Sequence, residues 1–399
     1  MTDPQAKTPV SLGYLFITFL KIGATAFGGF MALISVVQQQ LVQKDKVLDD
    51  EVVYEGIAIT SLMPGPMAVN TITFIGYHLR GWVGAFVCMS AVLLPTFLLM
   101  LGFTHYYLKY NTIPQIEFVF ITIIPVIVAI ILVVAFQMGK KYVTNKWHWT
   151  IAIIVFITTV WINSFEAILL IFLLSGLAGI QIDRFANAAN TSTKILNQPL
   201  KKPIFLLAFL AFMLVLQIVP TPEGILWSLG MVFSKVSLTL FGGGYVMVPI
   251  LQNLVVEQLS WLTTQQFVDA IALGQLTPGP ILISAAFVGY KLQGFLGALI
   301  ATIAIFFPSA LLTVFVSHYY QGFKDNPRVK AIFTGIRPAV VGMIASAALL
   351  IGNSVSYEWW SVLIGVAALV LLAKYRINAI YLILGSLVLG LLIYILKTL

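Results

Sequence analysis

The sequence contains one short stretch twice, first as Lys21-Ile22-Gly23-Ala24-Thr25-Ala26-Phe27-Gly28-Gly29 and again as Lys235-Val236-Ser237-Leu238-Thr239-Leu240-Phe241-Gly242-Gly243. Each copy carries a lysine inside an apolar run, about ten residues from the point where the run begins. At 1.5 Å per residue, each lysine is expected about 15 Å into a hydrocarbon core that is ~30 Å thick. Because an ammonium group there costs about 2.5 to 3.5 kcal/mol, an intramembrane lysine indicates a transport pathway or an anion-binding site.

The composition excludes a soluble globular protein. Hydrophobic residues make up 60% of the chain and charged residues 9%, and the mean hydropathy is +1.00. This balance predicts an all-α polytopic membrane protein. The single cysteine, Cys88, excludes an intrachain disulfide, and the four histidines are scattered, so neither a metal nor a cofactor is expected. The net charge of +8 is explained by membrane topology, and no nucleic-acid partner is expected.

The chain consists of two homologous halves. An offset of 214 residues aligns the two lysine stretches, and it also aligns Pro64-Gly65-Pro66 with Pro278-Gly279-Pro280. An offset of 213 then continues the alignment, for example from Pro95 to Pro308. Hydrophobic runs give about 13 transmembrane segments, including 12–37 and 52–77. We therefore expect three parts: an N-terminal repeat (1–182), a cytoplasmic loop with a linking transmembrane segment (183–223), and a C-terminal repeat (224–399).

The distribution of lysine and arginine predicts the orientation. If all thirteen segments cross, the side of the N-terminus holds 14 basic residues and the other side holds five. If both Pro-Gly-Pro segments are re-entrant instead, the split is 7 against 12, which is less decisive. The sequence thus favours thirteen crossings of the cell membrane, with the N-terminus in the cytoplasm and the C-terminus outside. Six segments per half plus one linking segment make the two repeats inverted, as in secondary transporters that bind substrate near the midplane.

Both motifs predict broken helices. The glycines of the two Phe-Gly-Gly stretches allow unusual backbone angles, and the freed N–H groups could bind an oxyanion; close helix packing through small residues is the alternative. Two prolines around a glycine should end a helix, and Pro66 and Pro280 suit the first position of a new half-helix, whose N-terminus attracts anions. The alternative is a structural kink. The predicted substrate-binding residues are Lys21, Thr25, Phe27, Gly28, Gly29, Pro64, Gly65, Pro66, Lys235, Thr239, Phe241, Gly242, Gly243, Gly244, Pro278, Gly279, Pro280 and Arg337.

Three further charged residues have two interpretations each. Glu55 and Asp269 occupy equivalent positions near the starts of their segments, where they are either proton-coupling carboxylates or ordinary partners of a helix dipole. Arg337 has no counterpart in the first half, where Ile124 stands. It could extend to the membrane interface, but the kink expected at Pro338 favours a place beside the substrate.

The paired Phe-Gly-Gly and Pro-Gly-Pro stretches, in halves of about 200 residues with an odd linking segment, resemble the chromate ion transporter family in its long, two-domain form. The resemblance covers nearly the whole chain. It implies a secondary transporter for chromate efflux and chromate resistance, with sulfate as a related oxyanion, driven by the proton gradient or by exchange as an antiporter. It carries the family motif onto Lys21, Phe27, Gly28, Gly29, Pro64, Gly65, Pro66, Phe241, Gly242, Gly243, Pro278, Gly279 and Pro280.

A tetrahedral dianion needs compensating charge and several hydrogen-bond donors, which Lys21, Lys235, Thr25, Thr239 and freed backbone amides can supply. The expected partners are chromate or sulfate, the lipid bilayer and, in a homodimer, a second copy of the chain. An anion channel could use the same donors, whereas inverted broken helices favour an occluded site. A membrane-embedded enzyme is not expected, because the sequence shows no paired carboxylates, histidine cluster or Ser-His set at membrane depth.

Overall fold

The described part of the chain is built from helices alone. The computed structural model describes residues 10–27, 29–61, 63–110, 114–162, 164–188, 223–239, 244–319, 327–353 and 358–398. These form two compact units. The first consists of Met1–His105, Glu223–Gly244 and Leu273–Tyr320, and the second of Tyr106–Pro222, Tyr245–Ala272 and Gln321–Leu399. Each unit therefore takes segments from both halves of the sequence.

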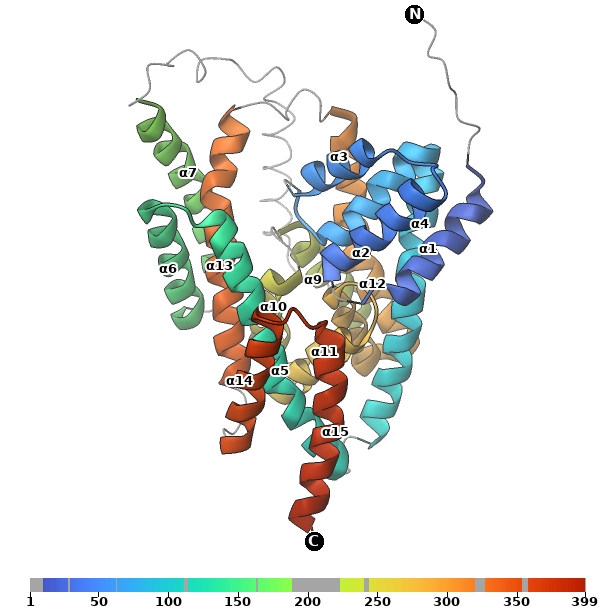
Figure 1. Ribbon diagram of the computed structural model, residues 1–399, viewed down its shortest axis with the longest axis vertical. Coiled ribbons are helices and arrows are strands. Elements are labelled where there is room, and N and C mark those ends of the chain that lie inside the picture. The colour runs from blue at the N-terminus through green and yellow to red at the C-terminus, as the bar shows by residue number, and fades with distance from the viewer. Residues whose placement is uncertain are drawn as a thin grey trace, which may run out of the picture. The chain divides into compact units, whose positions relative to one another are not determined.

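The first unit holds both lysine helices, both Pro-Gly-Pro turns and the long helices that follow them (Figure 1). Its elements are α1 (Leu12–Thr25), α2 (Gly29–Val37), the π-helix η1 (Gln38–Lys44), α3 (Asp50–Thr60), α4 (Met67–Tyr110, whose last turns enter the second unit), α9 (Ile225–Thr239), the 3-10 helix η4 (Ile281–Ile283) and α12 (Ser284–Tyr319).

The first predicted segment folds back on itself. α1 has 14 residues, about 21 Å, which is shorter than a ~30 Å hydrocarbon core. The Tyr14 hydroxyl near the start of α1 donates a hydrogen bond to the carboxylate of Asp45, which follows η1. The chain therefore returns to the level at which it entered. The helix break predicted at Phe27-Gly28-Gly29 is confirmed, since α1 ends at Thr25 with Ala26 as its cap, but 12–37 belongs to a helical hairpin and not to the predicted crossing by a broken helix.

The second predicted segment is also a hairpin. The hydroxyls of Thr60 in α3 and Thr71 in α4 lie 2.8 Å apart, and a Cβ added at Gly56 would lie 2.7 Å from the ring of Phe74. The residue number falls from 60 to 56 in α3 while that of its partner in α4 rises from 71 to 74, so α3 and the first turns of α4 are antiparallel. The segment 52–77 thus differs from the predicted crossing and takes the re-entrant alternative. A sequence cannot separate the two, because an apolar arm looks the same in a hairpin and in a broken crossing.

The two long helices of the first unit repeat each other and run in opposite directions. α4 contains two non-helical residues at Arg80–Gly81, and α12 contains two at Gln293–Gly294, which is the same place in the repeat. After these kinks, the rings of Trp82 and Phe315 have centroids 5.2 Å apart, and those of Phe97 and Phe295 are 6.1 Å apart. The part of each helix just after its kink therefore lies beside the later part of the other helix.

The second unit is a bundle around α5 and α13. Its elements are α5 (Pro114–Tyr142), α6 (Lys146–Trp161), α7 (Phe165–Ala188), the 3-10 helix η2 (Gly244–Val246), α10 (Met247–Gln252), the π-helix η3 (Asn253–Gln258), α11 (Thr264–Leu276, whose last turn lies in the first unit), α13 (Pro327–Gly352), α14 (Trp359–Ala373) and α15 (Ala379–Thr398). α13 packs on α5, α6 and α7, while α14 and α15 pack on α5. Glycines let these helices touch: a Cβ at Gly179 would lie 2.5 Å from the backbone nitrogen of Gly335.

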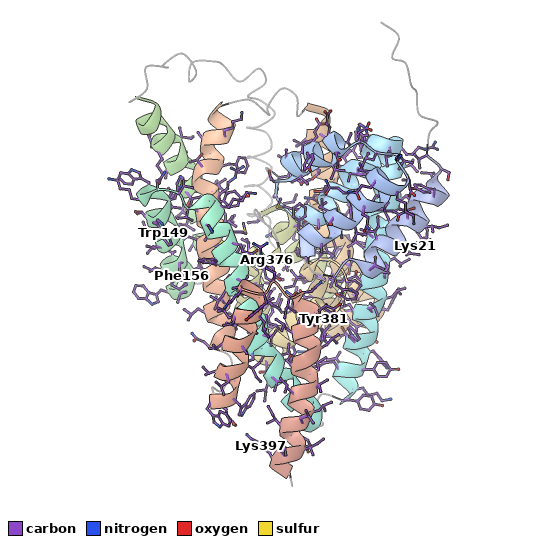
Figure 2. The ribbon with its side chains drawn as sticks, in the orientation of Figure 1. Lys21, Trp149, Phe156, Arg376, Tyr381 and Lys397 are labelled. Atoms are coloured by element: carbon purple, nitrogen blue, oxygen red, sulfur yellow. The ribbon has the colours of Figure 1, made fainter. Side chains whose placement is uncertain are left out.

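Lipid-facing features agree with the predicted membrane class. Five helices of the described residues are long and apolar enough to cross a membrane. The short helix α6 carries exposed tryptophans at both ends, with Trp149 at 59% and Trp161 at 82% exposure, and Figure 2 shows Trp149 directed away from the neighbouring helices. Tryptophan at both ends of an apolar helix is typical of the two membrane–water interfaces. The prediction of an all-α polytopic membrane protein is confirmed.

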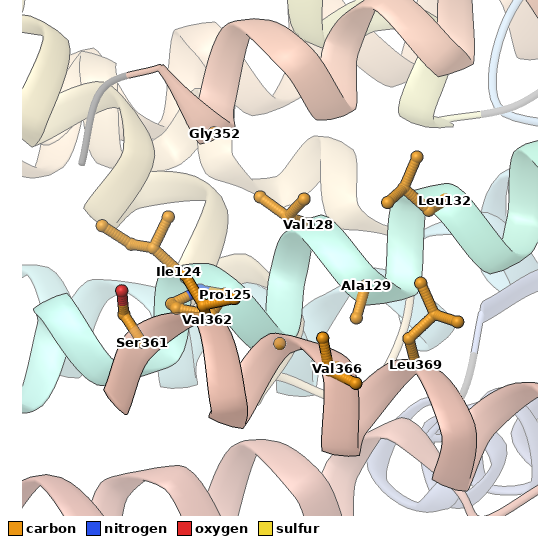
Figure 3. Close-up of a pocket in the computed structure, with 11 residues that line it drawn as sticks. Ile124, Pro125, Val128, Ala129, Leu132, Gly352, Ser361, Val362, Val366 and Leu369 are labelled. Carbon is orange, nitrogen blue, oxygen red and sulfur yellow. The ribbon is translucent and has the colours of Figure 1, made fainter. Parts of the chain in front are cut away.

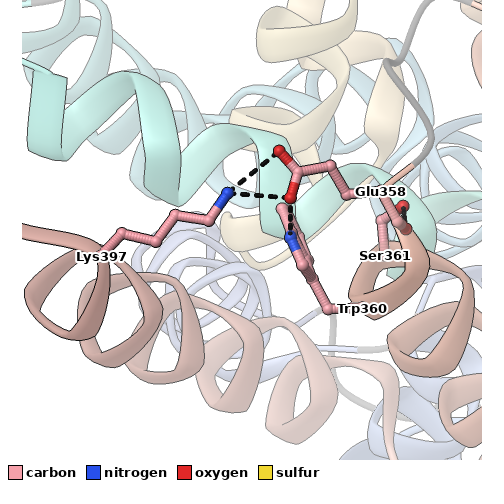
Figure 4. Close-up of polar contacts among 4 residues, drawn as sticks. All are labelled: Glu358, Trp360, Ser361 and Lys397. Atoms are coloured by element: carbon pink, nitrogen blue, oxygen red, sulfur yellow. Dashed lines mark hydrogen bonds and ion pairs between the residues drawn. The ribbon is translucent and has the colours of Figure 1, made fainter.

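An exposed ion pair joins α14 to α15 (Figure 4). The Lys397 ammonium donates to both carboxylate oxygens of Glu358, at 3.0 and 2.8 Å, and the Trp360 indole N–H donates to one of them at 2.6 Å. The hydrogen bonds from Lys397 and Trp360 hold the pKa of the Glu358 carboxyl below its usual range. This cluster ties the start of one helix to the end of the next.

Candidate functional site

The two Pro-Gly-Pro turns have matching geometry in the two halves. Gly65 has φ +102° and Gly279 has φ +115°, angles at which side chains are strained, so the central glycine is required. Pro66 and Pro280 stand one residue before the helices that begin at Met67 and Ile281, which corrects their predicted place as first helical residues by one position. The first N–H groups of these helices have no acceptor within their own helix.

Each turn lies against a hydroxyl from the other half. A Cβ added at Gly65 would overlap the side chain of Ser309, and one added at Gly279 would lie 2.8 Å from Oγ1 of Thr96. Thr96 also donates its hydroxyl to the carbonyl of Pro278. Because Thr96 and Ser309 are equivalent at the offset of 213, the two contacts are reciprocal.

The turn of the second half also reaches the break of the first lysine helix. The backbone N–H of Gly279 donates to the carbonyl of Ala26 at 3.2 Å, and Ala26 is the residue that ends α1. Two of the sequence-predicted motifs, more than 230 residues apart in the sequence, therefore meet within the first unit. α1 ends at this contact, and η4 begins two residues after Gly279. The last backbone acceptors of a helix from the first half therefore lie near the first backbone donors of a helix from the second half.

A polar cavity of about 340 Å³ lies between α1 and the returning η1, and Lys21 lines it. Figure 2 shows Lys21 on α1. The complete lining, all from the first half, is Tyr14, Ile17, Thr18, Lys21, Ile22, Thr25, Val36, Gln40, Lys44 and Asp45. Lys235 is not among these residues, so this cavity does not bring the two predicted lysines together.

The threonines expected to donate to substrate are bonded within their own helices. The Thr25 hydroxyl donates to the Lys21 carbonyl at 2.8 Å, and the Thr239 hydroxyl donates to the Lys235 carbonyl at 2.6 Å. Each would have to rotate away from its helix before donating to an anion.

The other charged residues predicted for the site are not among those that line the cavity. Asp269 is buried in the second unit, where its carboxylate accepts from the Tyr107 hydroxyl at 2.5 Å and from Gln265 at 2.9 Å, while Glu55 is half-buried on α3 of the first unit. The Arg337 guanidinium lies 5.2 Å from the centre of the Tyr142 ring in the second unit. Four predicted residues lie outside the described residues: Gly28, Phe241, Gly242 and Gly243.

A second cavity, of about 210 Å³, lies between α5 and α14 and has a different chemistry (Figure 3). Apolar residues such as Ile124, Val128 and Leu369 line it, and the Ser361 hydroxyl is the one polar side-chain group in its lining. That hydroxyl already donates to the carbonyl of Glu358 at 2.7 Å. A cavity of this kind cannot hold a dianion, because nothing in the lining compensates the charge.

Sequence reasoning missed several residues beside the Pro-Gly-Pro turns and in the cavity that Lys21 lines. Thr96 and Ser309 were not selected, although both follow an aligned proline by one position (Pro95 and Pro308), which is a signal that the repeat alignment already contained. Lys44 was assigned to a loop on the opposite face, because residues 12–37 were taken to cross the membrane.

Broken helices that meet across two homologous halves, beside a polar cavity with an intramembrane lysine, define the class of the protein as an α-helical membrane transporter. More specifically, the chain belongs to the chromate transporter family, because the family model described as chromate transporter matches residues 13–180 and 227–391.

Curated relatives agree with this assignment. A probable chromate transport protein of Synechococcus elongatus is 31% identical over 362 residues, which cover 90% of this chain and 89% of the relative. A chromate transport protein of Cupriavidus metallidurans is 29% identical over 393 residues, which cover 96% and 94%. An uncharacterized transporter of Bacillus subtilis is 32% identical over 164 residues, which are 92% of its length and 40% of this chain. No solved structure matches the chain.

Proposed function

We propose that this protein exports chromate from the cytoplasm, accepts sulfate as a related oxyanion, and binds the dianion where the two inverted repeats meet. The observation that carries the proposal is the contact between Gly279 and Ala26, which joins the broken helices of the two halves. Membership of the chromate transporter family supports the substrate. Sulfate and chromate share charge and tetrahedral shape, so a site made of backbone donors and lysine would accept both.

The binding residues in this proposal are those of the two lysine stretches and the two Pro-Gly-Pro turns, with Thr96 and Ser309 added. Lys21 and Lys235 supply charge, and the first N–H groups of α4 and η4 supply donors at the positive ends of helix dipoles. The reciprocal contacts of Gly65 with Ser309 and of Gly279 with Thr96 support a site related by the two-fold axis.

The orientation is part of the same proposal, and the hairpins strengthen it. Four of the thirteen predicted segments contain a Phe-Gly-Gly or Pro-Gly-Pro stretch. If each of these four is a hairpin that returns to the face it left, the other nine segments cross, and the termini still lie on opposite faces. The N-terminal side then holds 16 basic residues: Lys7, Lys44, Lys46, Arg80, Lys140, Lys141, Lys146, Arg184, Lys194, Lys201, Lys202, Lys324, Arg328, Lys330, Lys374 and Arg376. The other side holds only Lys109, Lys291 and Lys397. Since basic loops stay in the cytoplasm, the N-terminus is cytoplasmic and the C-terminus outside.

We assign proton coupling to Asp269 in preference to Glu55. Asp269 is 3% exposed and accepts two hydrogen bonds, so a change in its protonation would alter the contacts of a buried site. An acid of this kind can exchange a proton for a dianion across the membrane as the transporter changes conformation.

Flux measurements in proteoliposomes test the proposal. Purified protein is reconstituted, a pH gradient is imposed, and the uptake of radiolabelled chromate and sulfate is followed. Saturable chromate uptake that depends on the gradient is expected. Non-saturable flux that follows only the electrical potential would indicate an anion channel, and a chemically altered chromium or sulfur species would indicate an enzyme.

A further inference from the structure

The cavity between α1 and η1 has the composition of an anion-binding site. Two lysines, Lys21 from α1 and Lys44 from η1, face a single acid, Asp45, so the lining carries one excess positive charge. Among the described residues, Asp45 forms no ion pair with either lysine. Its Oδ2 accepts hydrogen bonds from the Tyr14 hydroxyl and from Gln40, the latter at 2.7 Å.

These two hydrogen bonds stabilise the ionised form of the carboxylate. They hold the pKa of Asp45 below its usual range, with the bond from Tyr14 as the largest cause. Asp45 therefore stays ionised at neutral pH and remains bonded to its own hairpin. Within the described part of the chain, neither the Lys21 nor the Lys44 ammonium forms an ion pair with a carboxylate, although Lys44 lies close enough to Asp45 to contribute to its lowered pKa. A small anion between the two lysines would complete this arrangement.

The depth of the cavity connects it to the broken helices. Lys44 lies next to Asp45, at the open end of the hairpin, while Lys21 lies seven residues beyond Tyr14 along α1, about 10 Å deeper. Ala26, the cap residue at the end of α1, lies five residues beyond Lys21, and its carbonyl accepts the hydrogen bond from Gly279. An anion that enters beside Lys44 would thus pass Lys21 on the way to the contact between the halves.

We propose that this cavity is a loading site for small tetrahedral oxyanions on the cytoplasmic face, with Lys44 as its outer ligand and Lys21 as its inner ligand. The proposal rests on the proposed transport function for its direction, and on the geometry of the hairpin for its position. It assigns Lys44 a binding role that the motifs do not contain, and it needs no residue of the second half.

Binding to the purified full-length chain in detergent provides the test. Equilibrium dialysis with radiolabelled chromate should show about tenfold weaker binding for Lys44→Gln, because one charge-assisted contact is lost. Lys44→Arg should stay within about twofold of the wild type, since the charge is kept. The matched control is Lys46→Gln, which removes the same charge two residues away from a side chain that does not line the cavity. Equal weakening by Lys44→Gln and Lys46→Gln, or none by either, would overturn the loading site.

The face of the membrane is tested separately. In a Cys88→Ser background, Lys46→Cys should react with a membrane-impermeant thiol reagent only from the cytoplasm. Reaction only from outside would overturn the cytoplasmic assignment. If vesicles with wild-type protein transport no chromate while Lys44→Gln still weakens binding, the proposed transport function fails and the binding cavity stands.

Discussion

The turn at Gly279 permits a quantitative prediction about what holds the broken helices in place. Gly279 has φ +115°, and an alanine there carries backbone strain of about 1 to 3 kcal/mol. Its Cβ would also lie 2.8 Å from Oγ1 of Thr96, and overpacking of this kind costs about 1 to 3 kcal/mol. Gly279→Ala should therefore destabilise the first unit by about 2 to 6 kcal/mol.

Thermal unfolding of the detergent-solubilised protein, together with chromate flux, measures this effect. The control is Gly294→Ala, since Gly294 has φ +57° and ψ −145° but nothing within 4 Å of its added Cβ, so that only backbone strain of about 1 to 3 kcal/mol applies. Adding Thr96→Ala to Gly279→Ala should recover the packing part, about 1 to 3 kcal/mol, as the coupling in a double-mutant cycle. If Gly279→Ala is no less stable than Gly294→Ala, or if Thr96→Ala recovers nothing, the packing argument is refuted.

Three further predictions concern coupling, pH and topology. Asp269→Asn should reduce proton-driven chromate uptake at least tenfold, while chromate exchange without a pH gradient persists. Tyr107→Phe keeps the acid and should reduce proton-driven uptake less. Equal rates of proton-driven uptake in the two variants would contradict the coupling role. Because the folded pKa of Glu358 is lowered, its ion pair with Lys397 stabilises the protein above the unfolded carboxyl pKa, and this contribution is lost as the pH falls through the folded value. Glu358→Gln should therefore lower the unfolding temperature slightly at pH 7 but not in strong acid, and a constant difference across that range would exclude the ion pair as the cause. A cysteine at Lys109, in a Cys88→Ser background, should be labelled from outside only; cytoplasmic labelling would contradict the nine-segment orientation.

Much of the fold follows from local properties of the sequence. The membrane class is predicted by composition, because so few charged residues cannot cover a soluble globule. The helix ends at Ala26 and before Met67 were predicted from glycine and proline, whose backbone preferences act within one or two residues. The duplication was also visible, since matching residues keep an offset of 214 and then of 213 residues along the chain.

The paths of the helices after each break depend on contacts between distant residues. The bond from Tyr14 to Asp45 spans 31 positions, and it shows that the first segment returns to its starting level. No periodicity predicts this return, because both arms of a hairpin are as apolar as the two parts of a broken crossing. The same reason hid the cavity, since Lys21 was expected near the midplane and Lys44 in a loop on the face opposite the N-terminus.

The sequence by itself therefore determined the class of the protein, its two halves and the positions of its broken helices, all of which depend on residue type and spacing. Only the tertiary structure decided that Thr96 lies against Gly279 and that Gly279 meets Ala26. These contacts join residues about 180 to 250 positions apart, and which surfaces meet depends on the packing of whole helices. The physical reason is that backbone preference acts locally, whereas a binding site needs side chains that only the folded chain brings together.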